Sequence, residues 1–325
     1  MSDLSESGVV FVFPGQGAQW DGMARELLDT APAFAAEMDR AAAALDPLTG
    51  WSLLDVLRGV PGAPDLDRVD VVQPVLFAMY VSLTALWRSH GVEPSAVIGH
   101  SQGEIAAAYV AGALDLPDAA RVIAQRSRLL AELAGSGGMG SLVLSAEKAQ
   151  EYLRRWPGRL TLAAINGPQS VVVSGEVQAL NELLVQCFRD DVMARKVKVD
   201  YASHSPLMEP LREPILTGLA SVSPRSGVVP FYSSTTATLV DTADLDAQYW
   251  FDNLRGAVLF EPALRAALAG HRTVIEVSPH PVLLDGIRAT IAAAGGTATA
   301  VGTLRRGHGG PAQFEESRAE IMAVR

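Results

Sequence analysis

Apolar residues recur along this chain in two patterns, short continuous runs and longer stretches with helical spacing. The run Val9–Phe13 predicts a strand that ends at a Pro-Gly turn, and residues 23–45 have helical periodicity, with a new helix expected at Pro32. Residues 75–87 are apolar enough for a buried helix, and a second strand at 96–99 precedes further helical sequence. Strands that alternate with helices predict the α/β class with a parallel sheet at its core.

A different order of elements follows the glycine-rich segment 135–138. The expected strands are 141–144, 160–165, 170–174 and 193–199, and the expected helices are 146–156 and 177–188. Strand-helix-strand-strand-helix-strand is the ferredoxin-like order. We therefore expect a small ferredoxin-like subdomain at 138–204, inserted into a large α/β-hydrolase-like domain made of 1–137 and 205–325. Cys187 falls on an apolar helical stripe and is expected in the core, and the last fifteen residues are expected to fray.

Composition and charge narrow the classes of partner. The 325 residues are 49% hydrophobic and 19% charged, with a net charge of −10, which argues against a nucleic-acid partner. The single cysteine excludes an internal disulfide or a cysteine-based zinc site. No apolar run reaches ~18 residues, and the first six residues lack the pattern of a secretory leader. We expect a cytoplasmic protein with no membrane contact and no metal.

The most specific chemical signal surrounds Ser101. The strand at 96–99 leads directly into Gly-His-Ser-Gln-Gly, and helical sequence follows. This strand-turn-helix context is typical of a nucleophile elbow, in which a sharp turn exposes the serine hydroxyl near a helix N-terminus. Backbone N–H groups there can hold the oxyanion that forms during acyl transfer. The alternative is a flexible Gly/Ser loop without catalytic function.

A serine nucleophile needs a base, and the histidines differ in context. His204 follows the last strand of the predicted insert, where two domains would form a cleft. His100 is adjacent to Ser101, but its side chain is expected to point away from the elbow. His280 lies between prolines, where a structural role is favoured over a catalytic one. Position alone leaves His204 as a candidate base rather than an assigned one.

Arg126 has two interpretations. It lies on the predicted helix 116–134 together with Arg121 and Arg128, which favours a solvated, charged helix face. The alternative is a buried guanidinium that binds a carboxylate by two parallel hydrogen bonds. The helix pattern alone favours the solvated face.

Several motifs, in order, resemble one family. The chain is similar over roughly residues 8–308 to the acyltransferase domain of modular type I polyketide synthases, which is related to bacterial malonyl-CoA:acyl carrier protein transacylases. The matching segments are 11–20 (FVFPGQGAQW), 99–104 (GHSQGE), 125–127 (QRS), 201–205 (YASHS) and 276–281 (EVSPHP). Independent motifs in the same order make a chance match improbable.

The resemblance implies a role for each matching residue. It makes Ser101 the nucleophile and His204 the general base, oriented by a backbone carbonyl near Gly256. It makes Arg126 the partner of a substrate carboxylate, which reverses the preference from the helix pattern. The remaining matches are Gln16 and Gln102, whose backbone N–H groups would form the oxyanion hole, and Gln73 and Asn166, which would line the site.

The implied reaction is a ping-pong acyl transfer in polyketide biosynthesis. Ser101 takes an extender acyl group from CoA, and the phosphopantetheine thiol of an acyl carrier protein removes it from the acyl-serine. A CoA thioester is then a substrate, and neither a metal nor a bound cofactor is needed. The ketosynthase and linker regions of a larger synthase are further possible partners, and the chain is expected to be either an excised domain or a free-standing enzyme.

The segment before His204 carries the expected selectivity. Tyr201 and Ser203 resemble methylmalonyl-selective members, because a phenylalanine at the position of Ser203 would crowd a substituent on C2. Gln102 and residues 68–73 (RVDVVQ) agree with this type. We therefore expect (2S)-methylmalonyl-CoA as the acyl donor, with malonyl- or ethylmalonyl-selective transfer as alternatives. Two other classes remain open, a serine hydrolase or editing thioesterase and a non-catalytic module that docks a carrier protein.

Overall fold

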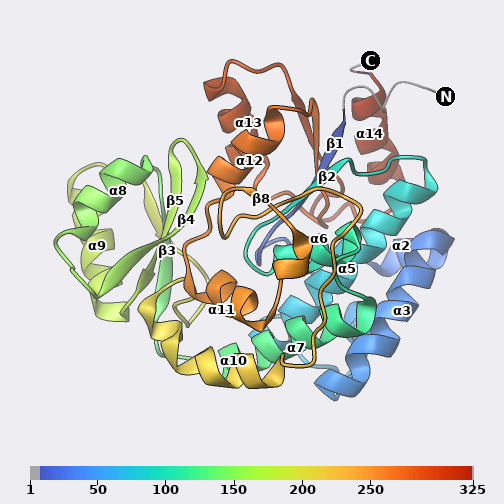
Figure 1. Cartoon of the computed structure of the whole chain (residues 1–325), viewed down its shortest axis with the longest axis horizontal. Helices are drawn as coiled ribbons and strands as arrows, with labels where there is room; N and C mark the ends of the chain where they lie inside the picture. The colour runs from blue at the N-terminus through green and yellow to red at the C-terminus, as the bar shows by residue number, and fades with distance from the viewer. Residues whose placement is uncertain (1–7, 324–325) are drawn as a thin grey trace.

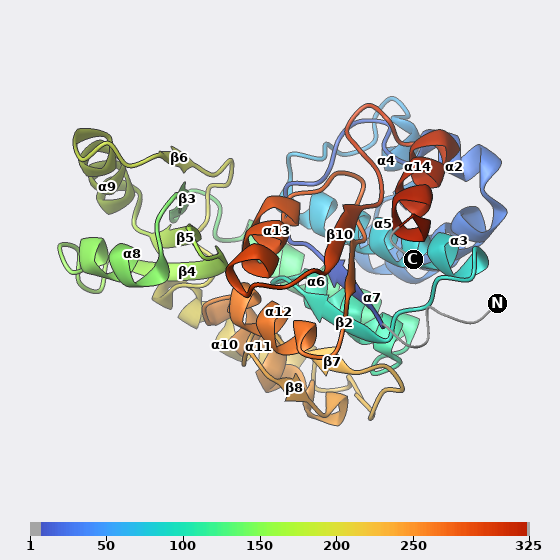
Figure 2. The same cartoon turned by 90° about the horizontal axis from the view of Figure 1, so that it is seen from above.

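Two β-sheets organise the chain, each with helices packed on it (Figure 1). The computed structural model describes residues 8–323, so the first six residues, from which the absence of a leader was judged, lie outside the described part. The larger sheet has six strands and the smaller has four. The smaller sheet lies to one side of the larger in both views of the molecule (Figures 1 and 2).

The larger sheet is parallel except at one edge, as expected for an α/β protein. Strand Val9–Phe13 lies in the middle and pairs on both sides with strands far away in sequence. Only the last strand runs antiparallel to its neighbour. In spatial order the strands are β10 (Thr299–Gly302), β9 (Thr273–Glu276), β1 (Val9–Phe13), β2 (Ala96–Gly99), β7 (Phe231–Tyr232) and β8 (Leu239–Val240).

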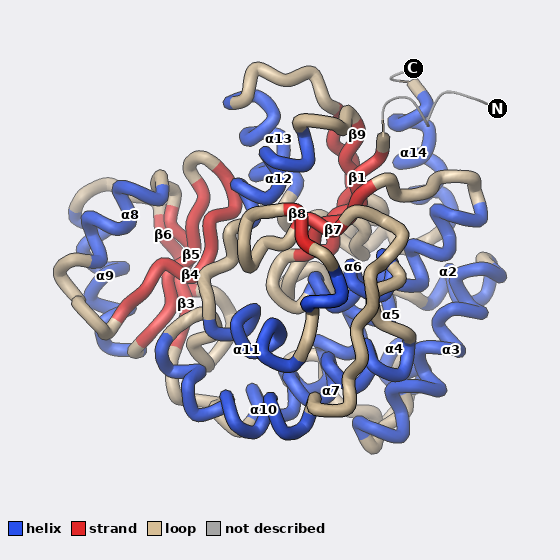
Figure 3. Tube along the Cα trace, in the orientation of Figure 1, coloured by secondary structure: helices blue, strands red, loops and turns tan. Residues whose placement is uncertain are grey.

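Helices cover both faces of this sheet (Figure 3). Alternate residues of β1 enter two separate cores, with Phe11 and Phe13 on one face and Val10 and Val12 on the other. The first core is built with α3 (Pro32–Thr49), α5 (Val69–Ser89) and α7 (Leu116–Ala131), and the second with α12 (Phe260–Leu268) and α13 (Leu284–Ala293). The other α-helices of this part are α2 (Arg25–Thr30), α4 (Leu53–Arg58), α6 (Gly103–Ala111), α10 (Arg212–Gly218), α11 (Ala247–Arg255) and α14 (Pro311–Met322).

Helix α5 is longer than the sequence pattern predicted, and most of its residues are buried. By length and composition alone it is the one helix among the described residues that could cross a membrane, with a mean hydropathy of 1.6. However, 89% of that stretch is buried inside the protein, where it packs against α3 and α7. Its apolar surface is therefore covered by protein, and we assign it as a core helix.

The smaller sheet is antiparallel and follows the expected order of elements, with shifted boundaries. Its strands, in spatial order, are β4 (Leu160–Gly167), β5 (Ser170–Gly175), β3 (Gly138–Leu142) and β6 (Ala194–Lys196), with helices α8 (Ala146–Leu153) and α9 (Val177–Arg189). Strand β3 begins three residues before the expected strand at 141–144, because Gly138 and Gly140 pair with β5 and lie against Leu180 of α9. Cys187 is buried in this core, as predicted.

The two sheets are joined through strand β4. The main chain of Val258 bonds to both Ala163 and Ile165, at 2.9 and 2.8 Å. Glycine is needed nearby at Gly286, because a Cβ there would lie 2.4 Å from the carbonyl oxygen of Asn166. These contacts fix β4, and with it the small sheet, against α12 and α13 of the larger part.

The prediction that the last fifteen residues fray is wrong for the described ones. Residues Pro311–Met322 form helix α14, which begins with a proline, a favourable first residue for a helix. Its Phe314 packs on Trp87 with ring centroids 4.6 Å apart, and Ile321 is buried as well. Phe314 and Ile321 are seven residues apart and so lie on the same face of α14, two turns from each other, with mostly polar residues between them.

Candidate active site

The nucleophile elbow forms where predicted, but glycine is required there for space. Ser101 itself takes the left-handed conformation, with φ of 54°, between β2 and α6. A Cβ at Gly99 would lie 2.1 Å from the backbone nitrogen of Glu104, and one at Gly103 would lie 2.0 Å from the carbonyl oxygen of Phe13. The turn is thus wedged against its own helix and against β1, and the strain falls on the serine.

Ser101 and His204 form a hydrogen-bonded pair. The serine Oγ lies 2.8 Å from Nε2 of His204, and the other ring nitrogen, Nδ1, lies 2.8 Å from the carbonyl oxygen of Gly256. Burial, and then the charge of Arg126, lower the pKa of His204 to about 3. The imidazole is therefore neutral at pH 7, with Nδ1–H donating to Gly256 and Nε2 free to accept the serine proton.

The main chain holds His204 from both parts of the molecule. Its N–H donates to the carbonyl of Leu254 at 2.9 Å, and its carbonyl accepts from the hydroxyl of Thr161 on β4 at 3.2 Å. The residue has φ of 60°, a conformation that costs a non-glycine residue energy unless its surroundings enforce it. The base is therefore fixed by contacts outside its own side chain.

Arg126 is buried beside the nucleophile, so a solvated helix face is the wrong interpretation for this residue. It is 3% exposed, and its Nη2 donates to Oγ of Ser101 at 2.9 Å, whereas Arg121 and Arg128 bond to other groups at the surface. Burial lowers the pKa of Arg126 to about 10, so the guanidinium remains charged at neutral pH. A cation in a buried site is the feature that an anionic group of a ligand would use.

The loop after β1 lies next to the elbow, because Phe13 and Gly99 are opposite each other in neighbouring parallel strands. The N–H of His100 donates to the carbonyl of Phe13 at 2.8 Å. This register brings Gln16, three residues after β1, to the same edge of the sheet as Gln102. The side-chain amide of Gln102 is buried, and neither its oxygen nor its nitrogen has a partner within residues 8–323.

Tyr201, one of the two residues expected to set selectivity, lies at the same place. The hydroxyl of Tyr201 donates to the side-chain oxygen of Gln16 at 2.9 Å, which joins the two motifs directly. Burial raises the pKa of Tyr201, and the charge of Arg126 acts in the opposite sense. Gln73, on α5, is buried at 4% exposed. Ser203 is buried as well, at 5% exposed.

Asn166 and His100 form a pair beside the site. Nε2 of His100 lies 2.8 Å from Oδ1 of Asn166, and its ring packs on Phe260 with centroids 5.9 Å apart. His100 thus points away from the serine, as expected. His280 accepts a hydrogen bond from the backbone N–H of Arg306 at 3.3 Å, in keeping with a structural role.

Two residues of the site were not predicted. Asn253 on α11 accepts from Nη1 of Arg126 at 2.7 Å, and Glu104 accepts from Asn253 at 2.8 Å. Glu104 was noted as part of the elbow motif without a role. A carboxylate directly ahead of the apolar residues 105–108 was a usable signal of a buried polar network. Nothing in the sequence around Asn253 indicates its place.

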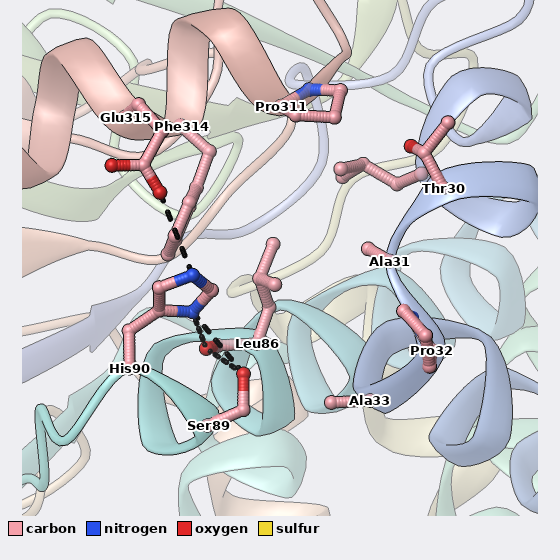
Figure 4. A pocket seen from close by; sticks show the side chains of 11 residues that line it. Thr30, Ala31, Pro32, Ala33, Leu86, Ser89, His90, Pro311, Phe314 and Glu315 are labelled. Carbon is pink, nitrogen blue, oxygen red and sulfur yellow. Dashed lines mark hydrogen bonds and ion pairs between the residues drawn. The ribbon is translucent and has the colours of Figure 1, made fainter.

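Two pockets among the described residues lie away from Ser101. One of about 280 Å³ opens between α2, α3, α5 and α14, where His90 faces Glu315 at 3.5 Å (Figure 4). Another, of about 350 Å³, lies along the loop 59–64. Neither pocket is lined by Ser101, His204 or Arg126.

Comparisons with known proteins agree with this geometry. The family model described as "Acyl transferase domain" matches residues 10–324. Polyketide synthase GfsB of Streptomyces halstedii is 59% identical over 97% of this chain and 6% of its own length, and erythronolide synthase EryA3 of Saccharopolyspora erythraea is 54% identical over 97% and 10%. The solved acyltransferase domain from module 8 of the salinomycin polyketide synthase is 54% identical, with a TM-score of 0.95 over 97% of this chain and 75% of that one. This chain therefore spans a small part of the curated relatives.

Proposed function

The chain belongs to the acyl transferase domain family, with polyketide synthase acyltransferase domains among its close relatives, and we propose that it transfers extender acyl groups from CoA to an acyl carrier protein. One observation carries the proposal. The hydroxyl of Ser101 lies between a neutral imidazole at 2.8 Å and a buried guanidinium at 2.9 Å. The neutral imidazole can accept the proton of a serine nucleophile, and the guanidinium can bind an acyl group that ends in a carboxylate.

The first half-reaction loads the serine. Nε2 of His204 takes the proton of Ser101 as Oγ attacks the thioester carbonyl, and the oxyanion is held by the backbone N–H groups of Gln16 and Gln102. When the C–S bond breaks, the CoA thiolate takes the proton from His204 and leaves. The products are CoA and an acyl-serine ester, and Arg126 holds the carboxylate of the acyl group throughout.

The second half-reaction unloads it. The phosphopantetheine thiol of the carrier protein gives its proton to His204, and its sulfur attacks the ester carbonyl. The C–O bond to Ser101 breaks, and the serine oxygen recovers a proton from His204. Every proton moves through one side chain, and each step uses only groups of this chain and its two substrates. Because the acyl donor that we propose is a CoA thioester, we also propose that the protein acts in the cytoplasm.

The acyl group that we propose is (2S)-methylmalonyl. Ser203 directly precedes the base and is buried. Its small side chain would leave room for a methyl group on C2 that a phenylalanine there would fill. Tyr201 is tied to Gln16, so its ring has one position beside the acyl group. A single methyl group gives about 1–3 kcal/mol of discrimination, so malonyl and ethylmalonyl groups are expected as slower substrates.

The architecture that accompanies the proposal has two parts. We assign the four-stranded sheet, with the order β4-β5-β3-β6, to a ferredoxin-like subdomain at 138–204. The remaining segments, 1–137 and 205–325, form the α/β-hydrolase-like part. Ser101 and Arg126 belong to the second part and His204 ends the first, so the site lies where the two meet.

The proposal is tested by the mass of the intact protein. The wild type and Ser101→Ala are mixed briefly with equal amounts of malonyl-, methylmalonyl- and ethylmalonyl-CoA. We expect a methylmalonyl adduct on the wild type alone, and loss of that adduct when a carrier protein with phosphopantetheine is added. CoA release without an adduct and without carrier protein would indicate a hydrolase, and absence of any reaction would indicate a docking module.

A further inference from the structure

The side chain of Asn253 is held in one orientation. Its Nδ2 donates to Oε2 of Glu104 at 2.8 Å and to the main-chain carbonyl of Ser101 at 3.1 Å. A carbonyl can only accept, and a carboxylate does the same, so the amide nitrogen is fixed on that side. The amide oxygen must then face the guanidinium, where it accepts from Nη1 of Arg126 at 2.7 Å.

Glu104 is itself held from all sides. It is fully buried, and it accepts from the N–H and the hydroxyl of Ser234, the hydroxyl of Thr235, the hydroxyl of Tyr249 and the amide of Asn253. These donors come from the segment after β7 and from α11, far along the chain from the elbow. A buried carboxylate with this many donors is a rigid reference point.

Arg126 forms no ion pair with the described residues, although the nearby charge of Glu104 raises its pKa against the larger effect of burial. Both hydrogen bonds that its guanidinium makes within residues 8–323 go to uncharged acceptors, Oγ of Ser101 and Oδ1 of Asn253, and its Nε has no partner there. An aspartate at position 253 would form an ion pair with the guanidinium. The amide instead orients the guanidinium without forming an ion pair with it, and leaves the Nε–H among the groups that a ligand could use.

We propose that Asn253, held by Glu104, is the positioning residue for Arg126 and thereby sets the preference for acyl thioesters that end in a carboxylate. The inference rests on the proposed function, because it assigns to Arg126 the acyl carboxylate as its ligand. Neither residue touches the acyl group. Their effect passes through the direction and the free charge of the guanidinium.

The test compares two thioesters that differ only in the carboxylate, methylmalonyl-CoA and propionyl-CoA. The kcat/KM for acylation of Ser101 is measured with each, in the wild type, Asn253→Ala and Asn253→Asp. We expect Asn253→Ala to lower the ratio of the two values roughly tenfold to a hundredfold, the range for a lost hydrogen bond to a charged group. Asn253→Asp keeps the hydrogen-bond acceptor but forms an ion pair with the guanidinium, which then binds the acyl carboxylate less well. We therefore expect a higher KM for methylmalonyl-CoA and an unchanged KM for propionyl-CoA.

Two buried glutamates provide a matched control. Glu276 is as fully buried as Glu104, but its carboxylate accepts mainly from backbone N–H groups, those of Val282 and Leu283, and it does not contact Asn253. Both Glu104→Gln and Glu276→Gln are expected to lower the melting temperature. Only Glu104→Gln is expected to lower the methylmalonyl-to-propionyl ratio.

The outcomes separate this inference from the proposed function. A wild type that is acylated, together with Asn253 and Glu104 variants that keep the wild-type ratio, overturns the positioning role alone. A wild type that acquires no acyl group overturns the proposed function and this inference together. A ratio that falls equally in Glu276→Gln shows a general effect of destabilisation and overturns the assignment.

Discussion

Two regions contribute to one site in different ways: the large sheet, and residues 197–205, which lead from the small sheet back to the larger part and are called the crossing segment here. On the large-sheet side, Ser101 and Arg126 are held by side chains, above all by Asn253. In the crossing segment, the His204 ring is held by the carbonyl of Gly256, and its main chain is held in addition by Leu254 and Thr161. A residue that is fixed through its main chain tolerates new side chains beside it. The difference fits the proposal that Tyr201 and Ser203, which lie close to the base in sequence, set selectivity while the base keeps its position.

Removing the nucleophile gives the largest expected effect on the large-sheet side. Ser101→Ala leaves no oxygen to form the acyl ester, so the covalent adduct disappears, and we expect transfer to the carrier protein to fall by a factor of at least ~10³. The measurement is CoA release together with intact mass. Transfer that persists at the wild-type rate would show that the serine is not the acyl carrier.

The packing of the elbow gives the next largest effect. A Cβ at Gly103 would lie 2.0 Å from the backbone of Phe13, and neither backbone can move without disturbing the sheet. We expect Gly103→Ala to lower the free energy of unfolding by about 3 kcal/mol. Urea denaturation measures it. Gly270→Ala is the control, because no atom lies within 4 Å of the added Cβ, and a comparable loss there would refute the steric argument.

The crossing segment is expected to change selectivity and not chemistry. Tyr201→His combined with Ser203→Phe fills the space beside the acyl methyl group, so the ratio of acylation rates should shift toward malonyl-CoA by about tenfold or more. Competition between malonyl- and methylmalonyl-CoA, read by mass, measures the shift. Ser203→Ala keeps the space and should keep the ratio. Unchanged competition in the double variant would remove this pocket from the selectivity assignment.

The pH dependence gives the smallest effect and sharpens the comparison. The pKa of His204 is lowered to about 3, below its ordinary 6.5, so the base stays neutral and kcat/KM should stay flat from pH 8 down to about pH 5. The unfolded chain binds a proton at this histidine that the folded chain does not, so stability is lost as pH falls from 6.5 toward 3. An acid limb of kcat/KM with a midpoint near 6.5, measured by stopped-flow acylation, would contradict the buried neutral base.

The sequence predicted elements whose signals are local. The strand Val9–Phe13, the elbow at Ser101 and the order of elements in the small sheet depend on neighbouring residues, and the structure has them. The observed boundaries differ from the predicted ones where pairing with another strand sets them. Strand β3, for example, begins at Gly138 because that residue pairs with β5. Helix α14 was missed because its charged residues outnumber Phe314 and Ile321, whose burial depends on contacts across the fold.

The residues of the site likewise differ in whether a local sequence signal predicts them. Ser101 follows from its motif, and the resemblance supplies a role for His204 and Arg126, whose burial no periodicity could have shown. Asn253 lies 152 residues from Ser101 in sequence, and its contact with the elbow is made only by the packing of α11. A residue whose function is to hold another has no local signal, since its partner is chosen by the tertiary fold.

The chain enters and leaves this fold on one side. The start of β1 and the end of α14 lie close together in both cartoon views (Figures 1 and 2). In relatives where the matching stretch is 6% or 10% of the polypeptide, neighbouring ends would let such a unit be inserted into a longer chain without separating the segments on either side of it. Exchanging one such unit for another would then leave the path of the rest of the polypeptide unchanged.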